Sequence, residues 1–316
     1  MRGHSLRLVP ACHQVNLRGN VMPMRLPISR RRFLRRSAVA SILATLSSPR
    51  LLLSAAPGPV APSGPGDFDL HVHLDNSTID KVLELSRERR VKFGIVEHAG
   101  TRANQYPALL SNDTELRRYL AMLEGKPVFK GIQAEWNDWM RCFSAATLAQ
   151  LDYVLTDAMT FPGKDGQRVK LWTADAAQQV DMADKQAFMD RFVDWHVEIM
   201  AREPIDILAN TTWLPAGMLE QWELYWTPPR MNKVIEAALK YGIALEISSS
   251  YKLPKVPFLK LAKTAGAKFS IGSNGRYPNM GKLDYCFDMA RQLDLKPADL
   301  FTPVPDGLKA VQRRKI

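Results

Sequence analysis

Short apolar runs alternate with longer amphipathic stretches along the chain from residue 67 onward. The runs are rich in the β-branched and aromatic residues that favour strands. Their lengths are those of single strands rather than of helices. We therefore expect strands at 68–74, 92–98, 129–136, 152–161, 205–213, 243–249 and 268–274.

The stretches between these runs have apolar residues three and four positions apart, which is the spacing of a helix with one buried face. In the stretch 229–242, for example, Val234, Ile235 and Ala238 fall on one face, and Gly242 stands where a helix C-cap is expected. We expect helices at 78–90, 114–124, 145–151, 185–203, 229–242, 258–266 and 283–293.

Strict alternation of strands and helices indicates parallel strands with covering helices. The two alternatives are a closed (β/α) barrel and an open doubly wound sheet. No glycine-rich phosphate loop follows the first run, which weakens the nucleotide-binding form of the open sheet. We expect a single-domain α/β fold, a TIM-like barrel of seven strand–helix units over residues 67–300, followed by a C-terminal tail at 301–316.

The positive charge of the chain is concentrated at its N-terminus. Of the 43 lysines and arginines, ten lie in residues 1–56, which contain no acidic residue, so 33 basic residues face 32 acidic ones in residues 57–316. Because the net charge of +11 belongs to the N-terminus, it does not indicate a basic groove for nucleic acid in the body of the protein. We expect a small-molecule substrate instead; the sequence does not indicate the oligomeric state.

An arginine-rich motif precedes a short run of small apolar residues near the N-terminus. The motif at 29–34, SRRRFL, resembles the twin-arginine (Tat) translocation motif, and the run at 37–48 is too short to span a bilayer comfortably. We expect residues 1–56 to be a Tat-type export signal with an upstream extension, and 57–66 to be a Pro/Gly linker. Export by the twin-arginine translocase would make the protein periplasmic or extracellular; the alternative is a basic disordered tail.

Polar residues collect at the C-terminal ends of the expected strands. In a barrel these ends form one rim, where active sites are built. The residues at these positions are His71, His73, Glu97, His98, Glu135, Asp157, Asn210, Glu246 and Asn274.

His71 and His73 form the strongest chemical motif, His-x-His followed by Asp75. Residues two apart on a strand face the same side, so both imidazoles should point into the barrel mouth. Two imidazoles and a carboxylate from another strand can hold a divalent metal, for which we choose Glu135. The alternative is a pair of structural histidines in the core.

The stretch FDLHVHLDNSTIDKVLELSRERRVKFGIVEHAG resembles the opening of the polymerase and histidinol phosphatase (PHP) superfamily. Residues 131–135, GIQAE, resemble the family's third strand with its bridging glutamate. GIALEISSS and FSIGSNGR resemble two later strands, so the resemblance runs from about residue 67 to about residue 276. It implies a distorted seven-stranded barrel and a metal-dependent phosphoesterase.

Residues 76–80 lack the further histidine that usually follows His-x-His in the family, and four other family positions are altered. The fourth-strand histidine falls on Met159, the fifth-strand histidine on Asn210, and the final Asp and His on Asn274 and Arg276. The three-metal cluster of the phosphatases cannot be complete here. The resemblance implies a reduced site with one or two ions of zinc, manganese or iron, or a relic without metal. The candidate metal ligands are His71, His73, Glu135, Asp157 and Asn274.

Three further residues are candidates for catalysis. His98 or Glu97 could serve as general acid or base, and Arg276 could bind a phosphate or carboxylate. Aromatic residues accompany them, because most tryptophans map to segments at the catalytic end. We select Trp136, Trp139 and Trp213 as candidate substrate-binding residues, with packing within the loops as the alternative.

These patterns give a leading hypothesis and two alternatives. The first is an exported PHP-like metal-dependent hydrolase of a small polar ester, either a phosphoester or a sugar derivative. The second is a PHP-like binding protein that has an aromatic cleft and no catalysis. An amidohydrolase-type enzyme acting on C–N bonds ranks lower, because the strand that would carry a carbamylated lysine has no obvious equivalent.

Overall fold

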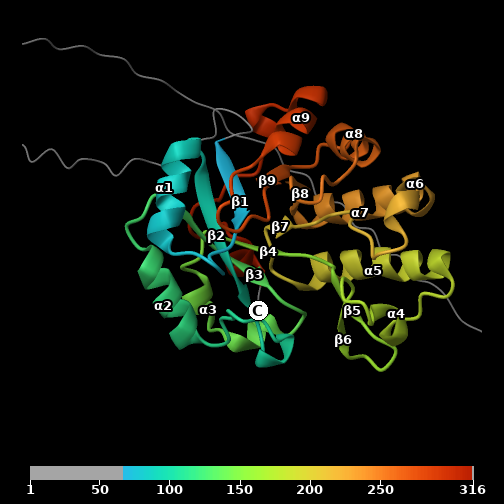
Figure 1. Cartoon of the computed structure of the whole chain (residues 1–316), viewed down its shortest axis with the longest axis horizontal. Coiled ribbons are helices and arrows are strands. Elements are labelled where there is room, and N and C mark those ends of the chain that lie inside the picture. The colour runs from blue at the N-terminus through green and yellow to red at the C-terminus, as the bar shows by residue number, and fades with distance from the viewer. Residues whose placement is uncertain (1–66, 315–316) are drawn as a thin grey trace, which may run out of the picture. The chain divides into compact units, whose positions relative to one another are not determined.

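The computed structural model describes residues 67–314, which form a nearly closed barrel of parallel strands (Figure 1). Backbone hydrogen bonds join the first and last strands, from His73 N–H to the Gly275 carbonyl oxygen and from Gly275 N–H to the His71 carbonyl oxygen. The predicted α/β barrel of seven strands is confirmed. The strands lie in the order β1 (Phe68–Val72), β2 (Lys92–Ala99), β3 (Phe129–Ala134), β4 (Tyr153–Thr156), β7 (Ile207–Leu208), β8 (Ala244–Ser248) and β9 (Phe269–Gly272).

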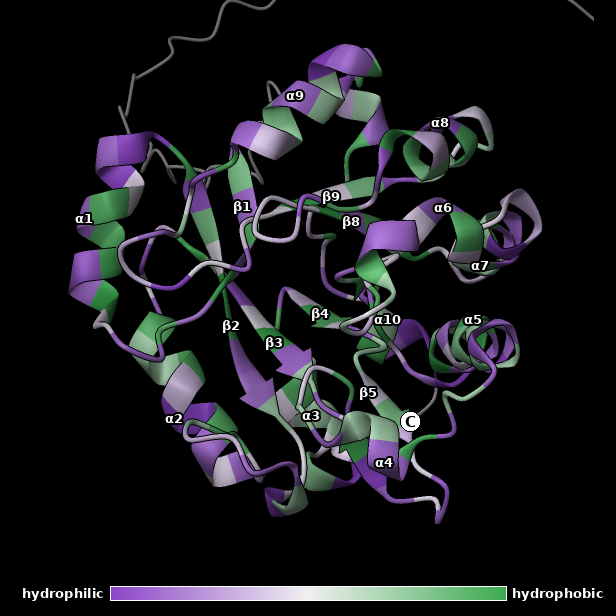
Figure 2. Ribbon diagram, turned by 45° about the vertical axis from the view of Figure 1, so that its right-hand side comes forward, coloured by the Kyte–Doolittle hydropathy of each residue, from purple (hydrophilic) through white to green (hydrophobic). Residues whose placement is uncertain are grey.

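Helices surround the strands, as Figure 2 shows for most of the ring. Each long helix follows a strand and begins and ends within two residues of its predicted bounds, and Gly242 has the left-handed backbone expected of a C-cap. The short predicted helix at 145–151 ends earlier, at Leu148. The helices are α1 (Ile79–Arg89), α2 (Asp113–Leu123), α3 (Ala145–Leu148), α5 (Lys185–Arg202), α7 (Pro228–Tyr241), α8 (Val256–Thr264) and α9 (Asp284–Gln292).

The predicted strand at 152–161 is two strands. Strand β4 ends at Thr156, where the Asp157 carboxylate accepts the Met159 N–H and the backbone turns out of the barrel. The following segment, β5 (Thr160–Pro162), pairs antiparallel with β6 (Arg168–Lys170) outside the barrel sheet. The apolar run is continuous in sequence, so hydrophobicity alone does not mark this break.

Short helices fill several connections. They are α4 (Ala176–Gln179), α6 (Trp222–Tyr225) and α10 (Ala310–Arg313), and none was expected from the sequence. The last of them belongs to the segment assigned as a C-terminal tail. Ala310 N–H donates to Asp206 Oδ1, and Arg314 donates to the carbonyl oxygens of Met200 and Glu203. Residues 301–314 are therefore packed against the barrel.

The interior of the barrel is closed by side chains below its polar mouth. Tyr153 lies across this interior and donates its hydroxyl hydrogen to the Leu70 carbonyl oxygen at 2.8 Å. Gly94 and Gly131 leave room for the ring, because a Cβ at either position would lie within 3 Å of a Tyr153 atom. The apolar residues around it are Phe68, Leu70, Val96, Leu155, Ile207, Ala209 and Ala244. The polar chemistry is thereby confined to the C-terminal end of the strands.

His196 is buried on α5, its Nδ1 lies 2.7 Å from the Phe192 carbonyl oxygen, and burial lowers its pKa to about 4. Within residues 67–314, no helix combines the length and apolar character that a membrane crossing requires. The predicted export signal at 1–56 and linker at 57–66 lie outside the described residues.

Replacing Gly131 by Ala should destabilise the barrel by about 1–3 kcal/mol. The added Cβ would lie 2.7 Å from Tyr153 Cζ and 2.8 Å from Val96 Cγ1, and neither side chain has free space to move into. Chemical denaturation would measure the loss. The same substitution in a Tyr153→Leu background should cost less, because the ring is gone. An equal cost in both backgrounds would contradict this packing.

Candidate metal centre

A cavity of about 310 Å³ opens at the C-terminal ends of the strands, where the sequence placed the active site. Its walls combine polar residues from several strand ends with aromatic residues from the connecting loops. Asn210 and Asn274 in this wall have positive φ angles, a conformation that non-glycine residues seldom adopt and that concentrates at functional sites. The polar lining comes from His98, Gln133, Asp157, Asn210, Asn274 and Arg276.

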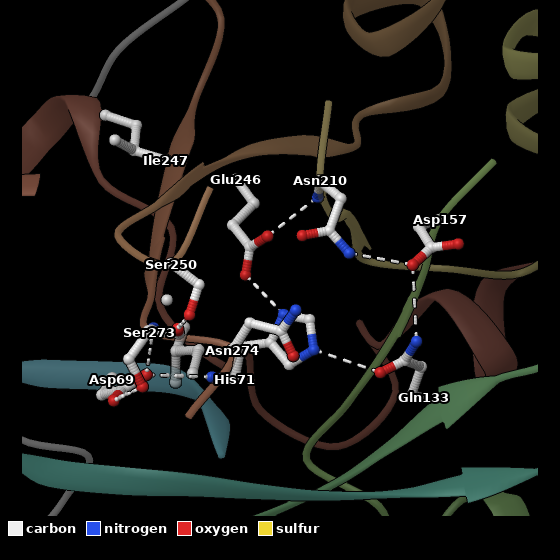
Figure 3. Close-up of polar contacts among 12 residues, drawn as sticks. Asp69, His71, Gln133, Asp157, Asn210, Glu246, Ile247, Ser250, Ser273 and Asn274 are labelled. Atoms are coloured by element: carbon white, nitrogen blue, oxygen red, sulfur yellow. Dashed lines mark hydrogen bonds and ion pairs between the residues drawn. The ribbon is translucent and has the colours of Figure 1, made fainter. Parts of the chain in front are cut away.

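Five buried or partly buried polar residues, three of which line the cavity, form a closed ring of hydrogen bonds (Figure 3). His71 Nδ1 lies 2.6 Å from Glu246 Oε1, and His71 Nε2 lies 3.1 Å from Gln133 Oε1. The Gln133 amide reaches Asp157 Oδ2 at 3.5 Å, and Asn210 Nδ2 donates to the same oxygen at 2.9 Å. The ring closes where Asn210 N–H donates to Glu246 Oε2 at 2.8 Å.

Both ring nitrogens of His71 are used within this ring. Nδ1 faces the Glu246 carboxylate, and Nε2 faces the side-chain amide of Gln133. Burial acts to lower its pKa, but the Glu246 carboxylate and the hydrogen bonds outweigh burial and raise it overall. His71 was predicted as a metal ligand; in this structure neither of its nitrogens is available to a metal.

A glycine makes the His71–Glu246 contact possible. The two residues lie on β1 and β8, and strand β9 runs between these strands in the sheet. A Cβ on Gly272 of β9 would lie 2.1 Å from Glu246 Oε1 and 2.8 Å from His71 Cβ. Only a residue without a side chain lets the two groups meet across β9.

His73 presents the opposite situation to His71. The side chain is fully buried, and neither of its ring nitrogens has a hydrogen-bond partner among residues 67–314. Burial and the nearby His71, His98 and Arg276 hold its pKa well below the usual range, so the ring is neutral. Leaving a buried polar atom unpaired costs about 1–3 kcal/mol, and a neutral imidazole nitrogen is the form that binds metals.

His98 is held in place by Glu135. Its Nδ1 lies 2.7 Å from Glu135 Oε1, and the Tyr106 hydroxyl donates to Glu135 Oε2 at 3.1 Å. This leaves Nε2 as the ring nitrogen through which His98 can bind a ligand. Glu135 was predicted as a direct metal ligand, but here its oxygens orient His98, as carboxylates next to metal-binding histidines commonly do.

His73, His98 and Asp75 together form a group that can hold a metal ion, because one ligand atom from each lies within 4.8 Å of the others. The carboxylate in this group is Asp75, two residues after His73, and both residues follow the end of β1. Asp75 also accepts a hydrogen bond from Arg276 Nε at 2.8 Å. The His-x-His-x-Asp spacing in the sequence places His73 and Asp75 in this group.

The other predicted site residues take different positions. Glu97 is buried; its Oε1 accepts the Leu74 N–H at 2.8 Å, its Oε2 lacks a partner among the described residues, and burial raises its pKa to about 7. Burial and the neighbouring Glu135 raise the pKa of Asp157, a member of the ring, to about 6. Asn274 Oδ1 accepts from Arg276 Nη1 at 3.2 Å, so this oxygen positions the arginine.

The predicted tryptophans do not line the cavity. Trp139 is fully buried and donates to Glu203 Oε2 at 3.0 Å, Trp213 is buried, and Trp136 packs on Trp195. The alternative, packing within the loops, describes these three. The aromatic lining comes instead from Tyr106, Tyr251 and the half-exposed Trp172. Sequence reasoning missed the two tyrosines because it searched for tryptophan alone.

No family model matches the sequence, and no curated protein matches it. Among solved structures, the chain is similar to the histidinol phosphate phosphatase of Lactococcus lactis subsp. lactis Il1403, a structure that contains zinc, L-histidinol and phosphate. The two chains are 13% identical over 72% of this chain and 92% of that chain, with a TM-score of 0.47.

Replacing Glu246 by Gln should destabilise the protein by about 2–4 kcal/mol, because the buried His71 loses the carboxylate that it is bonded to. The amide also cannot accept from both His71 and the Asn210 N–H. Urea denaturation would measure the loss, with Glu236→Gln on the exposed face of α7 as a matched control that should change stability by less than about 0.5 kcal/mol. Similar stabilities of the two variants would argue against the hydrogen-bond ring.

Proposed function

We propose that this chain is a metal-dependent hydrolase of a small phosphomonoester, related to the PHP superfamily that its sequence resembles. One divalent metal ion would be held by His73, Asp75 and His98. The observation that carries the proposal is His73, a buried neutral imidazole whose two nitrogens lack partners beside a carboxylate and a second imidazole. Two imidazoles and a carboxylate on one face suit zinc, manganese or iron.

The proposal favours one ion rather than two. His71 and Glu246 are already bonded to each other in the hydrogen-bond ring, and Asp157 is bonded there to Gln133 and Asn210. A second ion at these residues would have to break buried hydrogen bonds, including that of a buried charge pair. His73 and His98 need no such rearrangement, since their free nitrogens are already next to Asp75.

The reaction would use both the metal and residues of the cavity. When bound, the ion would lower the pKa of a coordinated water and polarise the ester oxygen. Arg276 would bind the anionic oxygens of the phosphate, and its bond to Asp75 fixes its orientation toward the metal-binding group. Glu97 Oε2, buried and unpaired near this end of β1, can hold a proton and exchange it with the reacting group.

Glu135 would act by positioning. Through Oε1 it holds His98 Nδ1, so that Nε2 points away from the carboxylate. The Tyr106 hydroxyl fixes the other oxygen of Glu135 and so restrains the carboxylate itself. Tyr106, Tyr251 and Trp172 give the cavity an aromatic wall that reduces the access of bulk water to the substrate.

A second candidate function is a binding protein without catalysis. The observation that favours it is the hydrogen-bond ring, which occupies His71 and Asp157, two of the predicted metal ligands. In this case the aromatic cavity would retain a ligand, and His73 would be a family relic. The two functions differ in whether the purified protein holds a metal and hydrolyses a phosphomonoester.

Protein purified without chelator should contain about one equivalent of a transition metal and should release phosphate from small phosphomonoesters. His73→Ala should lose both the metal and at least about 100-fold of the activity, because a ligand is removed. Elemental mass spectrometry and a phosphate-release assay measure the two effects. His196→Gln, which changes a buried histidine on α5, should retain both.

Protein that takes up no zinc, manganese or iron would rule out the hydrolase and leave the binding protein. A His73→Ala variant that keeps both metal and activity would show that the ion is held elsewhere. Circular dichroism of each variant verifies that the fold is intact, so loss of metal is not confused with unfolding.

Export is the remaining part of the proposal, and it rests on the arginine motif at 29–34. Replacing Arg30 and Arg31 by lysine should retain the protein in the cytoplasm of a bacterial host that has a twin-arginine translocase. Cell fractionation measures the change, with Arg35→Lys and Arg36→Lys outside the motif as the matched control. Equal export of both double variants would contradict recognition by this route.

A further inference from the structure

The hairpin formed by β5 and β6 is anchored over the barrel mouth by Arg168. Its guanidinium donates to Thr101 Oγ1 at 2.9 Å, Asn104 Oδ1 at 2.8 Å and Asp138 Oδ2 at 2.8 Å. These three partners lie in the loops that follow β2 and β3. Two residues further along β6, Lys170 extends from the same side of the strand. The anchored hairpin therefore brings a second basic residue to the mouth.

Lys170 lies over aromatic residues of the cavity wall. Its Nζ is 3.9 Å from the centre of the Tyr106 ring and 5.8 Å from that of Trp172. The Tyr106 ring also stacks on His98, with centroids 3.8 Å apart. Two groups this close to one ring cannot share a face, so Tyr106 lies between Lys170 and His98. The ammonium group is thus one aromatic ring away from a candidate metal ligand.

No acidic residue neutralises Lys170 within hydrogen-bonding distance among residues 67–314. Arg168 pairs with Asp138 and Arg276 with Asp75, whereas no ion pair or hydrogen bond of the Lys170 ammonium is found. The negative charge of Glu135 acts on Lys170 from a distance, and both oxygens of Glu135 are already bonded, to His98 and Tyr106. A partly buried cation that lies over aromatic rings and has no ion pair among residues 67–314 retains its capacity to bind an anion.

We propose that Lys170, flanked by Tyr106 and Trp172, is a second anion-binding subsite, and that the substrate is a phosphomonoester carrying another acidic group such as a carboxylate. This inference rests on the proposed function, which places the phosphate at Arg276 and the metal. Arg276 comes from the segment after β9, and Lys170 comes from the hairpin. Two cations from separate elements beside one cavity of about 310 Å³ suit a small molecule with two charged ends.

Calorimetric titration with non-hydrolysable phosphonates tests this subsite without relying on turnover. The probes are propylphosphonate and 3-phosphonopropanoate, which differ only in the terminal carboxylate, together with the analogous pairs that are one methylene shorter and longer. The zinc-loaded full chain should bind the carboxylated member of at least one pair about tenfold more tightly, as expected of one charge-assisted hydrogen bond.

Lys170→Gln keeps most of the side-chain stem and removes the charge. It should reduce the preference for the carboxylated probe to within about twofold and leave the affinity for the alkyl phosphonate unchanged. Lys164→Gln is the matched control, because Lys164 is exposed in the turn of the same hairpin and bonds to the Gln178 carbonyl oxygen. This control should retain the full preference.

Three results would overturn the subsite. These are a wild-type chain that binds both members of every pair equally, a preference that survives in Lys170→Gln, and an equal loss of preference in Lys164→Gln. In each case binding of the alkyl phosphonate itself would leave the proposed function standing. Failure of every phosphonate to bind the zinc-loaded chain would instead overturn the proposed function, and the subsite with it.

Discussion

The contact between His71 and Glu246 is the interaction on which the barrel mouth depends. It joins β1 to β8 across β9, and it exists only because Gly272 leaves the intervening position without a side chain. Burying two ionisable groups is costly unless each is paired and hydrogen-bonded, and here the pairing extends through Gln133, Asp157 and Asn210 until the ring closes. The ring fixes the ends of five strands relative to one another.

This ring also determines which residues remain available for chemistry. His71 and His73 are two positions apart on the same face of a strand, yet one has every nitrogen bonded and the other has none. The difference arises from their neighbours, since Glu246 and Gln133 lie within 3.1 Å of the nitrogens of the first imidazole. The groups outside the ring are His73, Asp75, which accepts from Arg276, and a His98 oriented by Glu135, and one ligand atom from each lies within 4.8 Å of the others.

The cavity beside these residues is built by loops as much as by strands. The β5–β6 hairpin interrupts the barrel order and returns to the mouth, where Arg168 is bonded to the loops after β2 and β3. Its anchoring places Lys170 over the Tyr106 ring, which stacks on His98, and His98 stacks in turn on His73. Arg276 lines the cavity, and Lys170 lies over the aromatic rings of its wall.

Periodicity in the sequence was sufficient to determine the order of seven strands and their helices, and strand geometry was sufficient to place His71, His73, His98 and Glu135 at one rim. Both follow from local rules: the apolar spacing of helices and strands, and the way parallel strands end together. The roles of these residues could not be predicted from these local rules. Neighbours that are distant in sequence decide whether a histidine binds Glu246 or stays free, and whether Glu135 faces a metal or His98. They also decide whether a tryptophan such as Trp139 lines a cavity or fills a loop core. Only the tertiary structure brings such neighbours within hydrogen-bonding distance, so only it could decide the chemistry of each side chain.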